Sequence, residues 1–134
     1  MNKDKFLQYI KDFNKRDWEK FVPTYFTEDV ILETANYRPK GIKDVKKHFI
    51  DFSKGLIETL TATKVLVDGN SIAALLHADF EFKEDRPDFR MRPMKKGDSL
   101  KISMFVFYET KGDKICSIQF GISPREPGMT VKLV

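Results

Sequence analysis

The sequence is poor in cysteine and in long apolar segments, and each absence excludes a class of protein. Cys116 is the single cysteine among 134 residues, which excludes an internal disulfide and a cysteine-based zinc site. Its neighbours Ile115 and Ile118 favour an unreactive strand thiol over a nucleophile. No stretch approaches the roughly 20 apolar residues of a membrane-spanning helix. The start, MNKDKFLQYIKDF, carries charges every few positions, unlike a signal peptide, so we expect a cytoplasmic protein.

The sequence also lacks a long block of one charge. The 24 basic and 20 acidic residues give a net charge of +4 and alternate along most of the chain. This pattern is typical of a solvated surface, whereas a nucleic-acid-binding protein concentrates Lys and Arg on one face. The basic stretches 38–47 and 85–98 could attract an anion, although exposed, solubilising charge is the favoured interpretation. We expect no nucleic acid, no membrane, no metal and no cofactor.

Phenylalanine, by contrast, is abundant, with 12 residues. A chain of this length forms one domain and buries roughly two-thirds of the surface that the unfolded chain exposes. We therefore predict a single domain over residues 1–134, with a core of 1–123 and a C-terminal extension of 124–134. The surplus of aromatic side chains could fill the core or line a cavity.

The first third of the chain has helical periodicity. The first predicted helix ends near Asn14, and Asp17 is a suitable N-cap for the second, which Pro23 should kink or shorten. A third helix begins after Gly41 and stops at Gly55. Their apolar stripes contain Phe6, Tyr9, Ile10, Phe13, Trp18, Phe21, Val22, Tyr25, Val45, Phe49 and Phe52.

The rest of the chain favours strands. A short strand is predicted over 30–35, and a hairpin over 57–67 and 71–83 around Asp68-Gly69-Asn70. A second hairpin follows the charged loop 85–98 and turns at Lys111-Gly112-Asp113. Helices followed by an antiparallel sheet indicate an α+β fold with the helices on one face of the sheet. The end of the chain could add an edge strand or cover an opening.

The segment HADFEFKED, residues 77–85, places His77, Asp79 and Glu81 at alternate positions. Acid–base chemistry or a metal would use such a trio, but alternate strand residues face the same side. The other parity, from Ile72 to Phe82, is uniformly apolar and must face the helices. The trio therefore lies on the outer face, where near-linear spacing disfavours a shared metal ion.

The outer face also carries apolar side chains, among them Leu75, Phe105 and Phe107. Exposed apolar clusters often mark an interaction surface. We therefore predict a homodimer that packs through this face at Leu75, His77, Phe105 and Phe107. The three apolar residues would be buried, while His77, Asp79, Glu81 and Lys101 would make polar pairs at the rim or across the subunits.

The stretch FNKRDWEKFVPTYFTEDVILETANYRPKGIKDVKKHF resembles the nuclear transport factor 2-like superfamily, in particular its SnoaL-like branch, which is polyketide-cyclase-like and ketosteroid-isomerase-like. The shared features are a helix ending in Asn14, the Asp17-Trp18 pair, an acidic pair before a strand, and Gly41 before a third helix. The hairpin segments VDGNSIA and ETKGDKI match as well. The resemblance covers about nine-tenths of the chain and ends near Ser123.

This resemblance implies a cone: a strongly curved, mostly antiparallel sheet wrapped around three N-terminal helices, with an apolar pocket inside and a dimer interface on the convex face. It also places the oxyanion tyrosine of ketosteroid isomerases at Tyr9, their base at Thr34 and their protonated acid at Val106. Threonine is no base near neutral pH and valine donates no hydrogen bond, so we expect that isomerase chemistry to be absent. The Asp-Arg-Asp arrangement of epoxide hydrolases has no counterpart.

Two groups of candidate residues follow. The candidate catalytic residues are His48, a general base or donor near the buried stripe of the third helix, and Tyr9; alternatively His48 lies at the stripe's edge with one nitrogen in water. The candidate ligand-binding residues are Trp18, Tyr25, Tyr37, Phe52, Phe80, Met104, Val106 and Tyr108.

These residues predict a small-molecule-binding protein with an apolar pocket for a hydrophobic or aromatic ligand. An isomerase, cyclase or dehydratase using His48 and a pocket tyrosine is the alternative within the pocket. A non-catalytic protein-interaction module is the third possibility, and the scarcity of inward carboxylates favours the non-catalytic interpretations.

Overall fold

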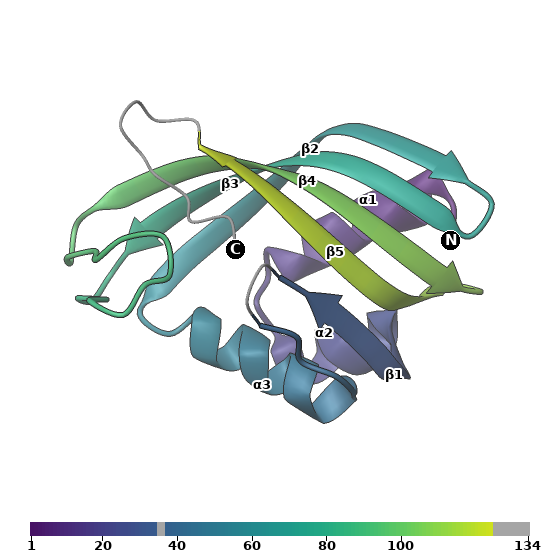
Figure 1. Ribbon diagram of the computed structural model, residues 1–134, viewed down its shortest axis with the longest axis horizontal. Helices are drawn as coiled ribbons and strands as arrows, with labels where there is room; N and C mark the ends of the chain where they lie inside the picture. Colours follow the sequence, from purple (N-terminus) through teal and green to yellow (C-terminus); the bar gives the residue numbers. More distant parts are fainter. Residues whose placement is uncertain (35–36, 125–134) are drawn as a thin grey trace.

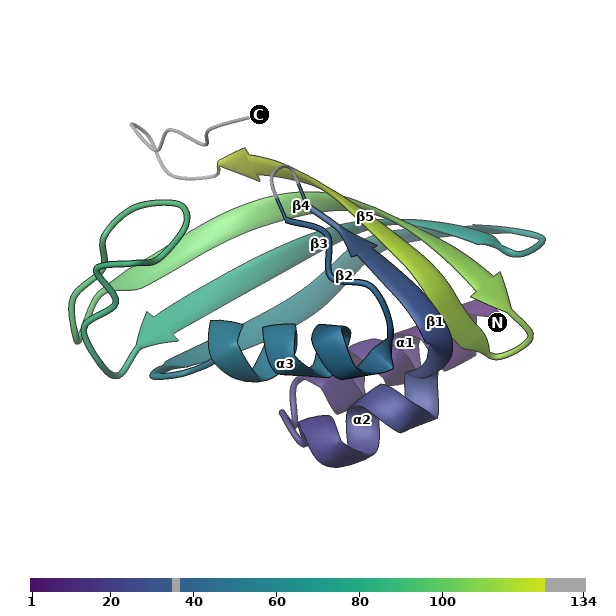
Figure 2. The same ribbon diagram turned by 60° about the horizontal axis from the view of Figure 1, so that its bottom comes forward.

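The computed structural model describes residues 1–34 and 37–124, which form one curved sheet with three helices on one side (Figures 1 and 2). The predicted α+β class is confirmed. The elements in chain order are α1 (Lys3–Phe13), α2 (Trp18–Tyr25), β1 (Phe26–Glu33), α3 (Ile42–Phe52), β2 (Leu56–Asp68), β3 (Ser71–Phe82), β4 (Ser99–Lys111) and β5 (Lys114–Pro124). No helix in the described ranges is both long and apolar enough to cross a membrane.

Two of the helices, α1 and α2, begin where a capping side chain accepts a hydrogen bond from one of their free N–H groups. The Asn2 side chain accepts a hydrogen bond from the Lys5 amide at the start of α1, and Asp17 accepts one from the Lys20 amide at the start of α2. The predicted N-cap at Asp17 is thus confirmed. Pro23 lies inside α2, which ends at Tyr25, as expected for a residue that interrupts helical hydrogen bonding.

The five strands are ordered β1-β5-β4-β3-β2, so β1 and β2 form the edges. Only the β1–β5 pair is parallel. At the β2 edge, the Asn14 amide forms two hydrogen bonds with the backbone of Leu60, one of 2.9 Å to its carbonyl and one of 2.8 Å from its N–H. The Asn14 side chain therefore pairs with the backbone of the edge strand in the way that a neighbouring strand would, and it attaches the end of α1 to the sheet.

The predicted strand parities are confirmed. On β3, Ile72, Leu76, Ala78, Phe80 and Phe82 are buried. The inward residues of β4 are likewise buried: Leu100, Ile102, Met104, Val106 and Tyr108. The opposite side of β4 keeps two phenylalanines accessible, with 61% of Phe105 and 41% of Phe107 exposed. One side of the sheet thus packs against the helices while the other carries exposed aromatic rings.

A β-bulge in β2 changes which of its residues face inward. Next to the turn, Asp68 pairs with Ser71, and this register continues as far as Lys64 opposite Leu75. Ala62 then pairs with Leu76, which leaves Thr63 without a paired residue. Because of this one extra residue, the part of β2 before Thr63 points its side chains to the opposite side of the sheet from the one that an uninterrupted register would give.

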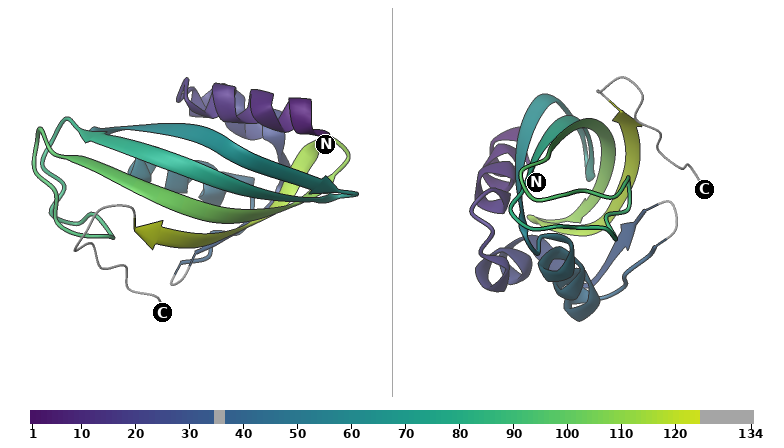
Figure 3. Two further views of the ribbon diagram at one scale, coloured as in Figure 1. Left: turned by 90° about the horizontal axis from the view of Figure 1, so that it is seen from above. Right: turned by 90° about the vertical axis from the view of Figure 1, so that its left-hand side faces the viewer.

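The loop between β3 and β4 crosses one end of the curled sheet (Figure 3, right). It was predicted as an exposed, charged segment, yet Phe89 and Met94 in it are buried. The Phe89 ring packs against Phe52, Phe80 and Phe82 at centroid distances of 5.5, 5.6 and 4.9 Å. This part of the loop therefore belongs to the core, which corrects the prediction for 85–98.

The first strand also differs from its prediction over 30–35. It begins at Phe26, because Phe26, Val30 and Leu32 are all buried, and the acidic residues expected before the strand lie within it. The C-terminal extension proposed for 124–134 lies outside the described residues apart from Pro124, which ends β5.

Candidate functional site

A pocket lies between α3 and the β3–β4 loop, and we call it the mouth pocket. Its volume is about 170 Å³, and it contains three of the residues proposed from the sequence, Tyr37, His48 and Phe52. The complete lining is Tyr37, His48, Asp51, Phe52, Arg86, Asp88, Phe89 and Arg90. The third helix and the loop thus bring together residues that are up to 53 positions apart in the chain.

Flat rings form the walls of the mouth pocket. The His48 imidazole lies 5.4 Å from the Tyr37 ring and 5.8 Å from the Phe52 ring, with the Phe52 pair stacked. Phe52 in turn contacts Phe89, at 5.5 Å. Tyr37 is 41% exposed, so one wall is open to solvent. Such walls suit the face of a planar ligand.

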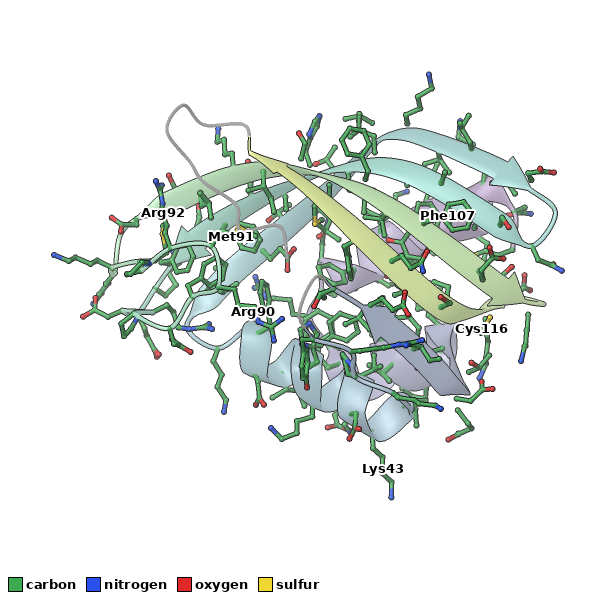
Figure 4. All side chains as sticks on the ribbon, in the orientation of Figure 1. Lys43, Arg90, Met91, Arg92, Phe107 and Cys116 are labelled. Carbon is green, nitrogen blue, oxygen red and sulfur yellow. The ribbon has the colours of Figure 1, made fainter. Side chains whose placement is uncertain are left out.

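The pocket lining contains two arginines and two aspartates, so its formal charges balance, and the two arginines have different roles. Arg86 is held in place, because its Nη1 donates to the Phe52 and Lys54 carbonyls at 3.0 and 2.6 Å and its Nε donates to Asp88 at 3.2 Å. Arg90 is exposed, and its guanidinium lies 4.7 Å above the centre of the Tyr37 ring. Figure 4 shows it between the loop and α3. Arg90 pairs with none of the described carboxylates.

His48 is uncharged at neutral pH. Burial, and to a lesser extent the charge of Arg90, lower the pKa of its imidazole from 6.5 to about 4, while Asp51 acts in the opposite direction. The imidazole therefore offers one N–H donor and one acceptor nitrogen. Its low basicity makes it a weak general base near pH 7.

The other proposed ligand-binding residues lie deeper in the cone. Trp18 stacks on Phe49 at 5.2 Å and donates from Nε1 to the Ser53 hydroxyl at 3.2 Å. The Tyr25 hydroxyl donates to Asp12 at 2.6 Å, and burial followed by this carboxylate raises the pKa of Tyr25 to about 12. The remaining proposed ligand-binding residues are also buried: Phe80, Met104, Val106 and Tyr108.

Tyr9 and His48, the two proposed catalytic residues, have separate surroundings. The Tyr9 ring contacts Tyr25 and Tyr108, at 5.3 and 5.8 Å, whereas His48 contacts Tyr37 and Phe52. Among the described residues Tyr9 and His48 make no direct ring contact, and the rings of Phe21 and Phe49 lie between them. Tyr9 therefore belongs to an interior cluster, and the tyrosine beside His48 is Tyr37.

An inward carboxyl group, Glu58 on β2, was missed by sequence reasoning. It pairs with Phe80 and lies between the buried Leu56 and Leu60 on the same face of the strand. Burial raises the pKa of Glu58 to about 8, and its charge interacts with both Tyr9 and Tyr108.

The bulge explains why the sequence did not reveal Glu58. Counted back from the Asp68–Ser71 pair without a bulge, Glu58 would lie opposite Glu81, on the outer face. The unpaired Thr63 shifts it to Phe80 and turns it inward. A hairpin register without a bulge therefore puts Glu58 on the outer face, whereas the observed register puts it on the inner face.

On the outer face, the trio of HADFEFKED makes separate contacts. His77 Nδ1 lies 3.0 Å from the Ser103 hydroxyl on β4, and Glu81 pairs with Lys83 at 3.4 Å. Asp79 has Lys101 as its register partner. A shallow groove of about 310 Å³ lies on the same face and is lined by Lys64, Leu66, Ala73, Ala74, Leu75, Phe105, Val106 and Phe107.

The curved sheet that encloses helices and a buried aromatic cluster defines the class of protein: a cone-shaped α+β domain of the nuclear transport factor 2-like type. Residues 6–118 match the SnoaL-like domain family, and the chain belongs to this family. A comparison with curated protein sequences gives no match.

Several solved structures with a similar fold are described as enzymes. A SnoaL-like polyketide cyclase from Agrobacterium tumefaciens is 20% identical, with a TM-score of 0.72 over 90% of this chain and 89% of the other. A putative polyketide cyclase from a Silicibacter species is 16% identical, with a TM-score of 0.76 over 90% and 87%. An epoxide hydrolase from M. tuberculosis is 7% identical, with a TM-score of 0.69 over 90% and 80%. At these identities the likeness establishes the fold alone.

Proposed function

We propose that the protein binds a small hydrophobic or aromatic molecule and that the mouth pocket is where it binds. The observation that carries this proposal is the convergence of Tyr37, His48 and Phe52 around a pocket that also contains Arg90. Its volume of about 170 Å³ is below the roughly 300–1,000 Å³ of drug-sized sites. The ligand is accordingly small, on the scale of one ring, unless Phe89 moves aside.

The polar side chains of the pocket, Arg90 and His48, indicate which ring-containing molecules fit best. Arg90 offers a planar guanidinium, which binds carboxylates with two parallel hydrogen bonds. The uncharged His48 adds one donor and one acceptor without repelling a cation or an anion. An aromatic ring that carries a carboxylate or another acceptor oxygen therefore matches the pocket.

Benzoate is a suitable first probe. In two-dimensional NMR at pH 6, benzoate is expected to shift the signals of Tyr37, His48 and Phe52. Arg90→Gln should weaken this binding by about tenfold, the lower end for a hydrogen bond to a charged group. Lys95→Gln removes an exposed positive charge from the same loop and serves as the matched control. Equal weakening by both variants, or no shift at the three residues, would refute the proposed site.

An isomerase, cyclase or dehydratase activity that uses His48 and a tyrosine is the second candidate. The contact between the His48 and Tyr37 rings, with centroids 5.4 Å apart, puts a tyrosine beside the histidine, while the lowered pKa of His48 speaks against efficient base catalysis near pH 7. Binding without catalysis is therefore the preferred function.

Assembly through the outer sheet face is part of the proposal. The groove beside Phe105 and Phe107, together with the 59% exposure of Leu66, offers an apolar patch that a second copy would cover. His77, Asp79 and Lys101 would supply polar pairs around it. Figure 4 labels Phe107, which lies on β4 within this patch.

Sedimentation tests the dimer. Phe105→Asp combined with Phe107→Asp should convert a dimer into a monomer, while circular dichroism confirms that the fold is kept. A wild-type protein that already sediments as a monomer at micromolar concentration would refute the dimer, and the non-catalytic interaction module would then need another partner. The proposal places the protein in the cytoplasm, where reducing conditions maintain Cys116 as a thiol.

A further inference from the structure

The free edge of β2 ends in a segment that is complementary to itself. Residues 64–68 read Lys-Val-Leu-Val-Asp, so two copies placed antiparallel about Leu66 match each valine with a valine and each lysine with an aspartate. β2 is an edge strand of the sheet. Within the described residues, no strand or bridge pairs with this segment on the side away from β3. We call residues 64–68 the edge segment.

The edge segment is accessible from outside. Lys64, Leu66, Val67 and Asp68 are exposed, with 59% of Leu66 and 40% of Val67 accessible. The hydrogen bonds that attach the end of α1 to β2 lie farther back, at Leu60. The tip of the β2–β3 hairpin extends beyond the start of α1 (Figures 2 and 3). Another strand can therefore approach the edge segment without meeting a helix.

Backbone groups at the edge segment are available for a further strand. Asp68 and Ser71 are paired and flank the two-residue turn, so they exchange the first backbone hydrogen bonds of the hairpin. Hydrogen-bonded and non-hydrogen-bonded pairs alternate along an antiparallel ladder. The N–H and C=O groups of Leu66 therefore point toward β3, whereas those of Val65 and Val67 point away from it. In the register centred on Leu66, Val65 of each copy lies opposite Val67 of the other, and these free groups meet.

The two charged residues of the edge segment favour the same register. Neither Lys64 nor Asp68 forms an ion pair with another described residue. With Leu66 opposite Leu66, each lysine faces an aspartate of the other copy, and opposite charges directly across a sheet are favourable. A register shifted by two residues would place Lys64 opposite Leu66 or Asn70. An unmatched lysine protects many sheet edges from pairing, but here a second copy supplies the matching charge.

We propose that a second copy of the chain pairs with the edge segment, β2 against β2, so that two sheets continue into one across a two-fold axis. This contact is separate from the assembly through the outer face, because it uses the backbone of β2 and leaves Phe105 and Phe107 uncovered. The edge segment is short compared with stable interfaces, which bury roughly 1,200 Å² or more. The pairing is therefore reversible and favoured by high protein concentration.

Disulfide trapping tests both the partner and the register. Leu66→Cys in a Cys116→Ser background places two thiols opposite each other, in a non-hydrogen-bonded pair with Cα atoms about 4.5 Å apart, which a disulfide can bridge. Val67→Cys in the same background is the matched control. It is also exposed, but the two copies of residue 67 would lie two positions apart, roughly 7 Å along the strand alone. Under mild oxidation, Leu66→Cys should form covalent dimers about tenfold faster, because only its thiols are held within reach of each other.

Charge exchange tests the pairing of Lys64 with Asp68. Adding Lys64→Asp to Leu66→Cys puts two carboxylates opposite each other at both ends of the segment and should slow the cross-linking about threefold or more. Adding Asp68→Lys as well restores opposite charges and should restore the original rate. The rate at which each variant reacts with iodoacetamide, a small uncharged reagent, corrects for changes in thiol reactivity. A rate that stays low in the exchanged variant would refute the ion pairs and the register that they favour.

The remaining outcomes separate the edge pairing from the outer-face dimer. The cross-link through Leu66→Cys should persist when Phe105→Asp and Phe107→Asp are added, since these replacements lie on β4. Loss of the cross-link in that background would show that the outer face holds the copies together and would refute the edge pairing. Equal rates for Leu66→Cys and Val67→Cys, or no covalent dimer with either, would refute it as well. None of these results depends on whether the mouth pocket binds benzoate.

Discussion

Replacement of Glu58 by glutamine should change the pH dependence of stability in a predictable direction. Burial raises the pKa of Glu58 in the folded protein to about 8, from its ordinary value of 4.5. The folded state thus holds the proton more tightly than the unfolded state, so the wild-type protein loses stability as the pH rises from about 4.5 to 8. Glutamine, which does not ionise, removes this loss.

The magnitude follows from the two pKa values. A difference of one in pKa corresponds to about 1.4 kcal/mol, so the change from 4.5 to about 8 corresponds to at most about 5 kcal/mol. Glu58 is partly exposed, and the resulting solvent screening should reduce the effect to about 2–3 kcal/mol. Glu58→Gln should therefore gain about 2–3 kcal/mol over the wild-type protein between pH 5 and pH 9.

Urea denaturation at pH 5, 7 and 9 measures this gain. Glu81→Gln is the matched control, since Glu81 is exposed on the outer face of the neighbouring strand and its replacement should stay within about 0.5 kcal/mol of the wild-type protein. Parallel curves for the wild-type protein and Glu58→Gln from pH 5 to pH 9 would show that Glu58 ionises normally. That result would contradict the raised pKa of Glu58 and the inward position that causes it.

Three further predictions concern the mouth pocket and the sheet edge. An NMR titration of His48 should have its midpoint near pH 4, because partial burial and the charge of Arg90 lower its pKa, and a midpoint above 6 would contradict that environment. Phe89→Ala should destabilise the fold by about 3 kcal/mol in urea denaturation, the cost of removing a buried aromatic ring, whereas a loss below 1 kcal/mol would indicate a mobile loop. Asn14→Ala should cost about 1–3 kcal/mol by loss of two hydrogen bonds to the Leu60 backbone, and an unchanged free energy of unfolding would show that these bonds contribute nothing.

Much of the architecture could be predicted from periodicity and turn chemistry. The N-cap at Asp17, the turn at Gly69 and the inward set from Ile72 to Phe82 all agree with the structure, because each depends on local backbone geometry. The strand parity likewise placed His77, Asp79 and Glu81 on the outer face. These features need no information on contacts between distant residues.

The site was less predictable, because long-range packing decides it. Phe89 belongs to a charged loop, and only contacts with Phe52, Phe80 and Phe82 make it part of the core. The bulge at Thr63 has no sequence signal such as glycine or proline, so an uninterrupted register of the Asp-Gly hairpin would put Glu58 opposite Glu81, on the outer face. Sequence reasoning also considered an inward carboxylate on β4, where Val106 lies, and did not consider β2.

Intermolecular NOEs between bound benzoate and the protein test the central claim most directly, because they locate the ligand. We predict NOEs from the ring protons of benzoate to the rings of His48 and Phe52, which line the mouth pocket. NOEs to Phe105 and Phe107 alone would place the ligand on the outer face of the sheet. That result would contradict a binding site inside the cone.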